Sequence, residues 1–174
     1  MRWSKLKQRV EERFAPEAVG RVEVHVTRYH RANDREGELF VTLDGTKTYG
    51  ASDWNYFAEK YGNAFNSPNL KNWKPMEEDD DDLLARGIWS QHELIAGMSE
   101  SLNQTIDDML ASPHPLIRAL AILDVRCGQR RLAKLDLEIE HELVVRFHGL
   151  RTAGHRASLD TVQQSHSRSE EASA

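Results

Sequence analysis

One stretch decides the fold: residues 115–134, with the sequence PLIRALAILDVRCGQRRLAK. Its first turns carry apolar side chains on nearly every side, and a helix that is apolar all round belongs in a core. Pro115 suits the first helical position, where the missing N–H costs nothing, and Gly128 suits the left-handed residue just past a helix end. We therefore predict a buried central helix that begins at Pro115, is closed by Gly128, and places Leu120 and Leu123 in the core.

The composition is that of an ordinary globular protein. The 174 residues are 39% hydrophobic, which is enough for one sizeable core. A charged fraction of 29% and a net charge of -5 give no general reason to expect binding to nucleic acid or to a membrane. The single cysteine, Cys127, excludes an internal disulfide and is expected to be buried and inert. No apolar run reaches the roughly 18 residues of a membrane span, and no signal peptide opens the chain, so we predict a cytoplasmic protein.

The N-terminal part predicts a helix followed by a small sheet. A stripe of apolar residues indicates an amphipathic helix, which Pro16 terminates. Alternation then predicts three strands, RVEVHVTRYH at 21–30, ELFVTL at 38–43 and TKTYG at 46–50. Asp44 and Gly45 form a strong hairpin signal, and a two-residue turn would pair Phe40 with Tyr49 and Val41 with Thr48. We predict a three-stranded antiparallel meander.

The rest of the chain predicts helices, one loop and a tail. Ser90 begins a helix that is expected to run to about Ala111. Residues 64–86, which include six consecutive acidic residues, predict a flexible acidic loop. Residues 135–139 alternate like a strand but also fit a helical stripe; we favour an extended segment with a helix from about Glu140.

These elements predict an α+β fold, with an N-terminal helix, a three-stranded antiparallel meander, and C-terminal helices packed on the sheet. Residues 1–153 form a single domain, and residues 154–174, which have almost nothing to bury, predict a disordered tail.

Several separated motifs resemble one family. They are M-R-W-S-K-L-K at the start, G-R-V-x-x-H-x-T-R-Y at 20–29 and H-P-L-I-R-A-L-A-I-L-D-V-R-C-G-Q-R-R-L at 114–132. In this order they look like a family of small, uncharacterised bacterial proteins, over roughly residues 1–151. The resemblance implies a bacterial cytoplasmic setting, but no activity, cofactor or catalytic residue.

Templates for catalysis fit poorly. His92 and Glu93 start like a zinc-protease helix, but Ala96 stands where the second ligand belongs. No nucleophile elbow, phosphate-binding loop or dinucleotide fingerprint occurs in the sequence. We expect no metal, cofactor or catalytic residue, and a non-enzymatic protein. An enzyme built from separated residues, such as His25 and Thr27, is the last-ranked interpretation.

Two surfaces are candidates for binding. The first, the aromatic face, lies on one side of the sheet and would bind a partner, either an unidentified protein, which we favour, or single-stranded nucleic acid. It comprises His25, Thr27, Tyr29, Phe40, Lys47 and Tyr49. The alternative is that aromatic residues of the following helix, or a C-terminal helix, simply cover this face.

The second surface, the basic cluster, would contact the phosphates of nucleic acid. It comprises Arg118, Arg126, Arg130, Arg131 and Lys134. The alternative is a salt-bridged helix corner, because acidic residues such as Asp124 lie close in sequence. Arg118, on an otherwise apolar helix, needs a carboxylate from another segment. The favoured function is a non-enzymatic protein-binding module, and the runner-up is nucleic-acid binding through the basic cluster.

Overall fold

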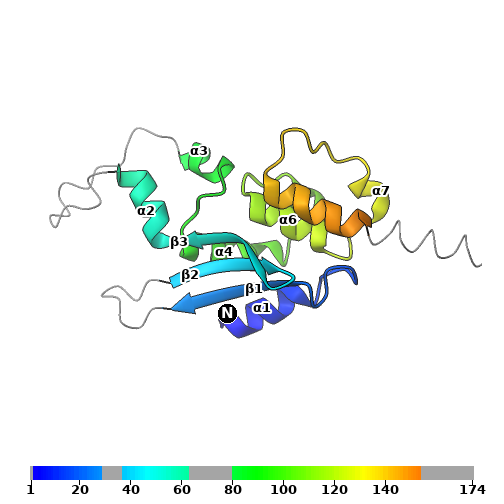
Figure 1. Ribbon diagram of the computed structural model, residues 1–174, viewed down its shortest axis with the longest axis horizontal. Coiled ribbons are helices and arrows are strands. Elements are labelled where there is room, and N and C mark those ends of the chain that lie inside the picture. The colour runs from blue at the N-terminus through cyan, green and yellow to red at the C-terminus, as the bar shows by residue number, and fades with distance from the viewer. Residues whose placement is uncertain (1, 29–36, 63–79, 154–174) are drawn as a thin grey trace, which may run out of the picture.

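The computed structural model describes residues 2–28, 37–62 and 80–153, and the statements below concern these residues (Figure 1). The elements are, in order, α1 (Trp3–Glu11), β1 (Val22–Arg28), β2 (Gly37–Leu43), β3 (Thr46–Ser52), α2 (Asp53–Tyr61), α3 (Asp80–Ala85), α4 (Gln91–Ser101), α5 (Ile106–Leu110), α6 (Pro115–Leu123) and α7 (Gln129–Leu132). Residues 142–153 form a further helical segment. The three strands make one antiparallel sheet in the order β1-β2-β3. The predicted α+β class is therefore confirmed.

The sheet contains a bulge that the sequence did not predict. Val41 pairs with Tyr49 and Phe40 with Gly50, because the register shifts between Val41 and Thr42. Thr48 is the extra residue, and its hydroxyl donates to the Val41 carbonyl at 3.2 Å. The predicted pairing of Phe40 with Tyr49 is wrong: one extra residue moves every later side chain of β3 to the opposite face.

The central helix α6 is buried as predicted. Every residue of α6 except Arg118 is buried, and Leu120 and Leu123 are only 4% and 0% exposed. The predicted end at Gly128 is wrong. The helix stops at Leu123, whose carbonyl accepts the N–H of Ala15 at 2.7 Å, so the chain leaves the helix to pair with the segment after α1.

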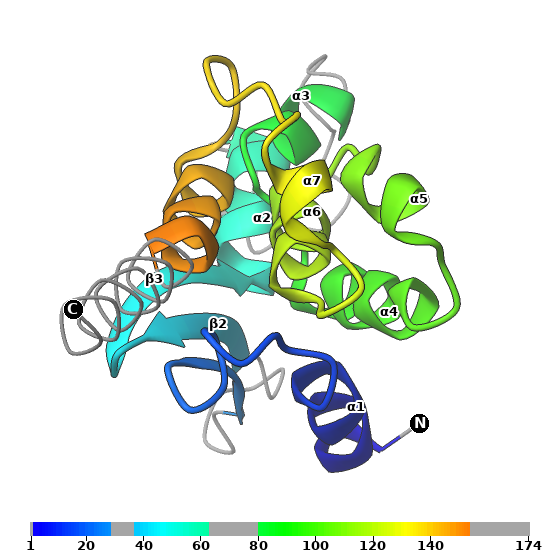
Figure 2. The same cartoon turned by 90° about the vertical axis from the view of Figure 1, so that its right-hand side faces the viewer.

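One side of the sheet carries the core. Figure 2 shows α1, α4 and α6 on this side. Val24 and Val41 of the sheet are fully buried there, together with Met98 of α4 and Phe147 of the C-terminal helical segment. No described helix is long and apolar enough to cross a membrane.

Helix α1 also closes the open edge of the sheet. Lys7 and Glu11 form an ion pair at 2.6 Å, and both reach the backbone of Val24 in β1. Lys7 donates to the Val24 carbonyl and Glu11 accepts the Val24 N–H, each at 2.9 Å. Since an unpaired strand edge invites association with another strand, this pair shields β1.

Two helical predictions need correction. The helix expected from Ser90 to about Ala111 is two helices, because Thr105 and Asp108 form a capping box that starts α5 anew. Helix α3 occupies the end of the range predicted as acidic loop; Leu83, 1% exposed, ties it to the interior. Residues 63–79 and the predicted tail lie outside the described residues.

Residues 135–139 form neither helix nor strand, and the helical segment begins two residues later than expected, at residue 142.

Candidate functional site

The chain that follows α6 lines a hollow with basic walls. Its volume is about 670 Å³. The residues that line it are Asp107, Arg126, Gly128, Gln129, Arg130, Arg131 and Lys134. We call it the basic hollow. Helix α7 forms one wall and α5 supplies Asp107 from across the gap, and Figure 2 shows both helices on the same side of the molecule.

One arginine of the hollow is held by a buried carboxylate. Arg126 and Asp124 approach to 2.6 Å, and the side chain of Asp124 is only 3% exposed. The same carboxylate accepts the backbone N–H of Arg126 at 2.9 Å. The side-chain hydrogen bond to Asp124 raises the pKa of Arg126. Asp124 is therefore committed to Arg126, and this pair is part of the fold.

The other cations are held loosely or not at all. Arg131 pairs with Asp107: its Nε lies 3.0 Å from one carboxylate oxygen, and its Nη2 donates to the other at 3.2 Å, but the Asp107 side chain is 74% exposed. Arg130 and Lys134 are exposed, and in the described part of the chain neither has an acidic partner. Within the part of the chain that the structure describes, the hollow thus keeps two positive charges that form no ion pair.

Arg118 does not belong with the other members of the basic cluster. It lies in the first half of α6 and pairs with Glu140 at 2.9 Å. It also donates to the carbonyls of Ser112 and Pro113, each at 2.8 Å. The prediction of a carboxylate from another segment is confirmed, whereas its placement in an anion-binding surface is wrong, because its donors are already used.

The aromatic face is smaller than predicted. His25 and Phe40 stack with their ring centroids 4.7 Å apart, and the Lys47 ammonium lies 5.6 Å from the Phe40 ring. Lys47 also pairs with Glu38. Thr27 lies beside them on β1 and bonds to the backbone of Glu38.

Two predicted members of the aromatic face are not found there. Tyr49 is 8% exposed and points into the core because of the bulge, so its assignment to this face is wrong. Tyr29 lies outside the described residues.

A family model of the SF0329 protein family matches residues 2–152. The chain belongs to the SF0329 protein family. The match covers nearly the same range as the motifs that indicated a family of small proteins, but its description names no activity. No curated protein and no solved structure matches the chain.

The SF0329 chain has a buried polar relay that the sequence analysis missed. His114 is fully buried and caps α6 by accepting the Leu116 N–H on Nδ1 at 3.0 Å. The hydrogen of the neutral ring is therefore on Nε2, which donates to the Tyr49 hydroxyl at 3.1 Å. Tyr49 in turn donates to the Gly87 carbonyl at 2.8 Å. Both ring nitrogens of His114 and the Tyr49 hydroxyl thus have hydrogen-bond partners inside the fold, as buried polar groups require.

Burial sets the protonation of this relay. It lowers the pKa of His114 to about 3, with the nearby Arg118 as the second cause, and it raises the pKa of Tyr49. Trp89 stacks on His114 with the ring centroids 4.0 Å apart. The signal available in the sequence was the His-Pro pair at a helix start, where a side-chain acceptor is needed.

Arg151 is a second buried residue that the sequence analysis missed. It is 4% exposed and donates to the carbonyls of Ile122, Asp124 and Cys127, at 2.7, 3.1 and 3.0 Å. Its nearest carboxylate is Glu17, at 3.4 Å. Arg151 thus fastens the C-terminal helical segment to the end of α6 and supports the backbone that precedes the basic hollow.

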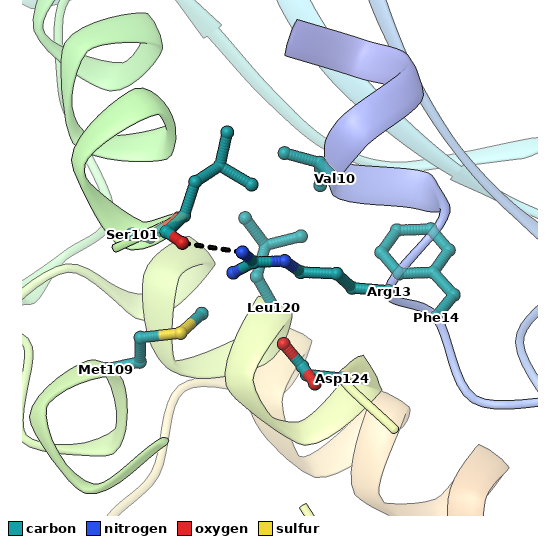
Figure 3. Close-up of a pocket in the computed structure, with 8 residues that line it drawn as sticks. Val10, Arg13, Phe14, Ser101, Met109, Leu120 and Asp124 are labelled. Carbon is teal, nitrogen blue, oxygen red and sulfur yellow. Dashed lines mark hydrogen bonds between the residues drawn. The ribbon is translucent and has the colours of Figure 1, made fainter. Parts of the chain in front are cut away.

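A second, much smaller cavity lies between α1 and α5 (Figure 3). Arg13 extends into it and donates to the Leu102 carbonyl at 2.6 Å, and Asp124 lines the cavity beside Arg13. Its volume of about 10 Å³ is at the lower limit for one water molecule, so it does not hold a substrate. Among the described residues, no group of three His, Cys, Asp or Glu side chains could hold a metal ion.

Proposed function

We propose that the protein is a non-enzymatic binding module of the bacterial cytoplasm that holds the phosphates of nucleic acid in the basic hollow. The supporting observation is the pair of uncompensated cations, Arg130 and Lys134, beside the guanidinium groups of Arg126 and Arg131. Such groups bind phosphate through charge-assisted hydrogen bonds, and they do so more readily where no carboxylate already occupies them. The aromatic face is the weaker candidate, since the Tyr49 side chain is buried in the core and does not belong to this face.

A titration of a labelled single-stranded oligonucleotide, followed by fluorescence anisotropy, tests this proposal. Binding should weaken steeply between about 50 and 200 mM salt, because phosphate contacts release counterions. The variant Arg130→Ala/Lys134→Ala should lose about ten-fold or more in affinity. Lys5→Ala/Arg9→Ala is the matched control: it removes the same charge from exposed positions of α1 and should bind like the wild type. Equal losses of affinity in both double variants would show that binding depends only on net charge, and would refute a defined site.

The second candidate is a protein partner on the aromatic face. It is favoured by the half-exposed stack of His25 and Phe40, which carries Lys47 at its margin. A partner recovered from the native host should bind in a defined stoichiometry and be lost in Phe40→Ala. Undiminished binding by Phe40→Ala would exclude this surface.

A further inference from the structure

Within the basic hollow, the two ion pairs differ in how easily an anion could replace the carboxylate. Asp124 is buried and bound by both the backbone and the side chain of Arg126, so its release would leave a buried charge without a partner. Asp107 is 74% exposed and, among the residues that the structure describes, pairs only with Arg131; pairs of this exposure contribute little to stability. The hollow therefore contains one arginine, Arg126, that a buried carboxylate holds permanently, and one, Arg131, whose carboxylate partner a stronger anion can displace.

The charges of the hollow also limit the kind of anion it can take. Once Asp107 has moved aside, Arg130, Arg131 and Lys134 face the hollow without a carboxylate, and Arg126 remains paired. All the cations lie in residues 126–134, so among the described lining residues no basic track leads away from the hollow. Phosphodiesters beyond the few that reach the hollow would need such a track, whereas a dianionic phosphate at the end of a strand does not.

From this arrangement we infer that the basic hollow recognises a terminal phosphate, such as the 5′-phosphate of a nucleic-acid strand, and that Asp107 occupies Arg131 until that phosphate displaces it. This inference rests on the function proposed above. A terminal phosphomonoester carries close to two negative charges at neutral pH, one more than an internal phosphodiester. It also presents three acceptor oxygens to the guanidinium groups.

The test compares two oligonucleotides of one sequence, with a 5′-phosphate or a 5′-hydroxyl and the label at the 3′ end. The wild-type chain should bind the phosphorylated strand about five- to ten-fold more tightly, and Arg130→Ala/Lys134→Ala should abolish that preference. Asp107→Asn should strengthen binding of the phosphorylated strand about two- to five-fold, since the phosphate no longer competes with a carboxylate. Glu100→Gln, which removes the same charge from an exposed position of α4, is the matched control and should leave affinity unchanged.

The possible failures are distinguishable. Equal affinity for the two strands, with loss of binding in Arg130→Ala/Lys134→Ala, would overturn the terminal-phosphate inference and leave the proposed function standing. Preference for the phosphorylated strand without any effect of Asp107→Asn would refute the displacement of Asp107. Absence of binding to both strands would refute the proposed function as well. Inorganic phosphate, added to the complex of the protein with the 5′-phosphorylated strand, should displace that strand only weakly. Binding of inorganic phosphate without binding of either strand would assign the hollow to a free anion.

Discussion

Because His114 is buried in its neutral form, the free energy of unfolding should fall in mild acid. The size of this effect follows from the surroundings of the ring. The folded protein holds the imidazole neutral, with a pKa of about 3, because the ring is buried and lies near the positive charge of Arg118. In the unfolded chain the pKa returns to about 6.5. Below pH 6.5 the unfolded state therefore binds more protons than the folded state, and the free energy of unfolding falls as pH falls.

The magnitude is set by the interval between the two pKa values. Each pH unit inside that interval costs up to about 1.4 kcal/mol, so lowering the pH from 7 to 5 should remove about 2 kcal/mol of stability through His114 alone. Urea unfolding at pH 7, 6 and 5 measures this loss, and His114→Asn provides the comparison. Asparagine keeps a side-chain acceptor for the helix start but does not titrate. The variant should be less stable at pH 7, and its deficit should shrink by about 2 kcal/mol at pH 5.

An independent measurement covers the case in which His114→Asn does not fold. Histidine NMR of the wild-type chain should show that His114 stays neutral, in the Nε2–H tautomer, at every pH above about 4.5 at which the protein is folded. A His114 resonance with a midpoint near pH 6.5 would refute the reasoning. So would a stability difference between wild type and variant that does not change with pH. Burial also lowers the pKa of His141. Since His141 is present in both proteins, its contribution to the pH dependence cancels from the comparison.

Three further predictions concern other parts of the fold. Replacing Arg151 by Met should cost about 3–5 kcal/mol in urea unfolding, because three buried carbonyls lose their donor and the nearby Glu17 carboxylate loses its counter-charge. The exposed control Arg146→Met should cost less than about 1 kcal/mol. Glu11→Ala should lower the free energy of unfolding by about 1–2 kcal/mol, because the Val24 N–H at the edge of β1 loses its acceptor. The freed edge should also produce larger species in light scattering, and scattering equal to that of the wild type would show that the edge is protected in another way. Cys127 should resist thiol reagents in the native protein and react fully in urea, because burial raises the pKa of its thiol; rapid native labelling would contradict that burial.

The sequence predicted those features that depend on residues close together in the chain. The alternation of valines gave the meander, Ser90 was placed correctly as a helix cap, and the apolar turns after Pro115 indicated the buried helix. Four of the five cations in the basic cluster meet in one hollow because they lie within residues 126–134. Local spacing is sufficient for such features, since each is settled within two or three turns of backbone.

Features that depend on distant segments were not predictable in this way. The partner of Arg131 is Asp107, which α5 brings near from 24 residues away. The early end of α6 follows from backbone pairing with the segment after α1. No glycine or proline at position 48 marks the bulge in the sequence. It appears only when the pairing of β2 with β3 is known.

That bulge decides which side chains of β3 reach the core. Without it, a strand of the same length would pair Tyr49 with Phe40 and exchange the inside and the outside of β3 from Thr48 onward. Tyr49 would then turn to solvent, His114 would lose the acceptor for its ring hydrogen, and the polar Ser52 would move to the side now taken by Ala51. Deleting Thr48, by contrast, should leave a regular hairpin in which Tyr49 still lies opposite Val41 and faces the core.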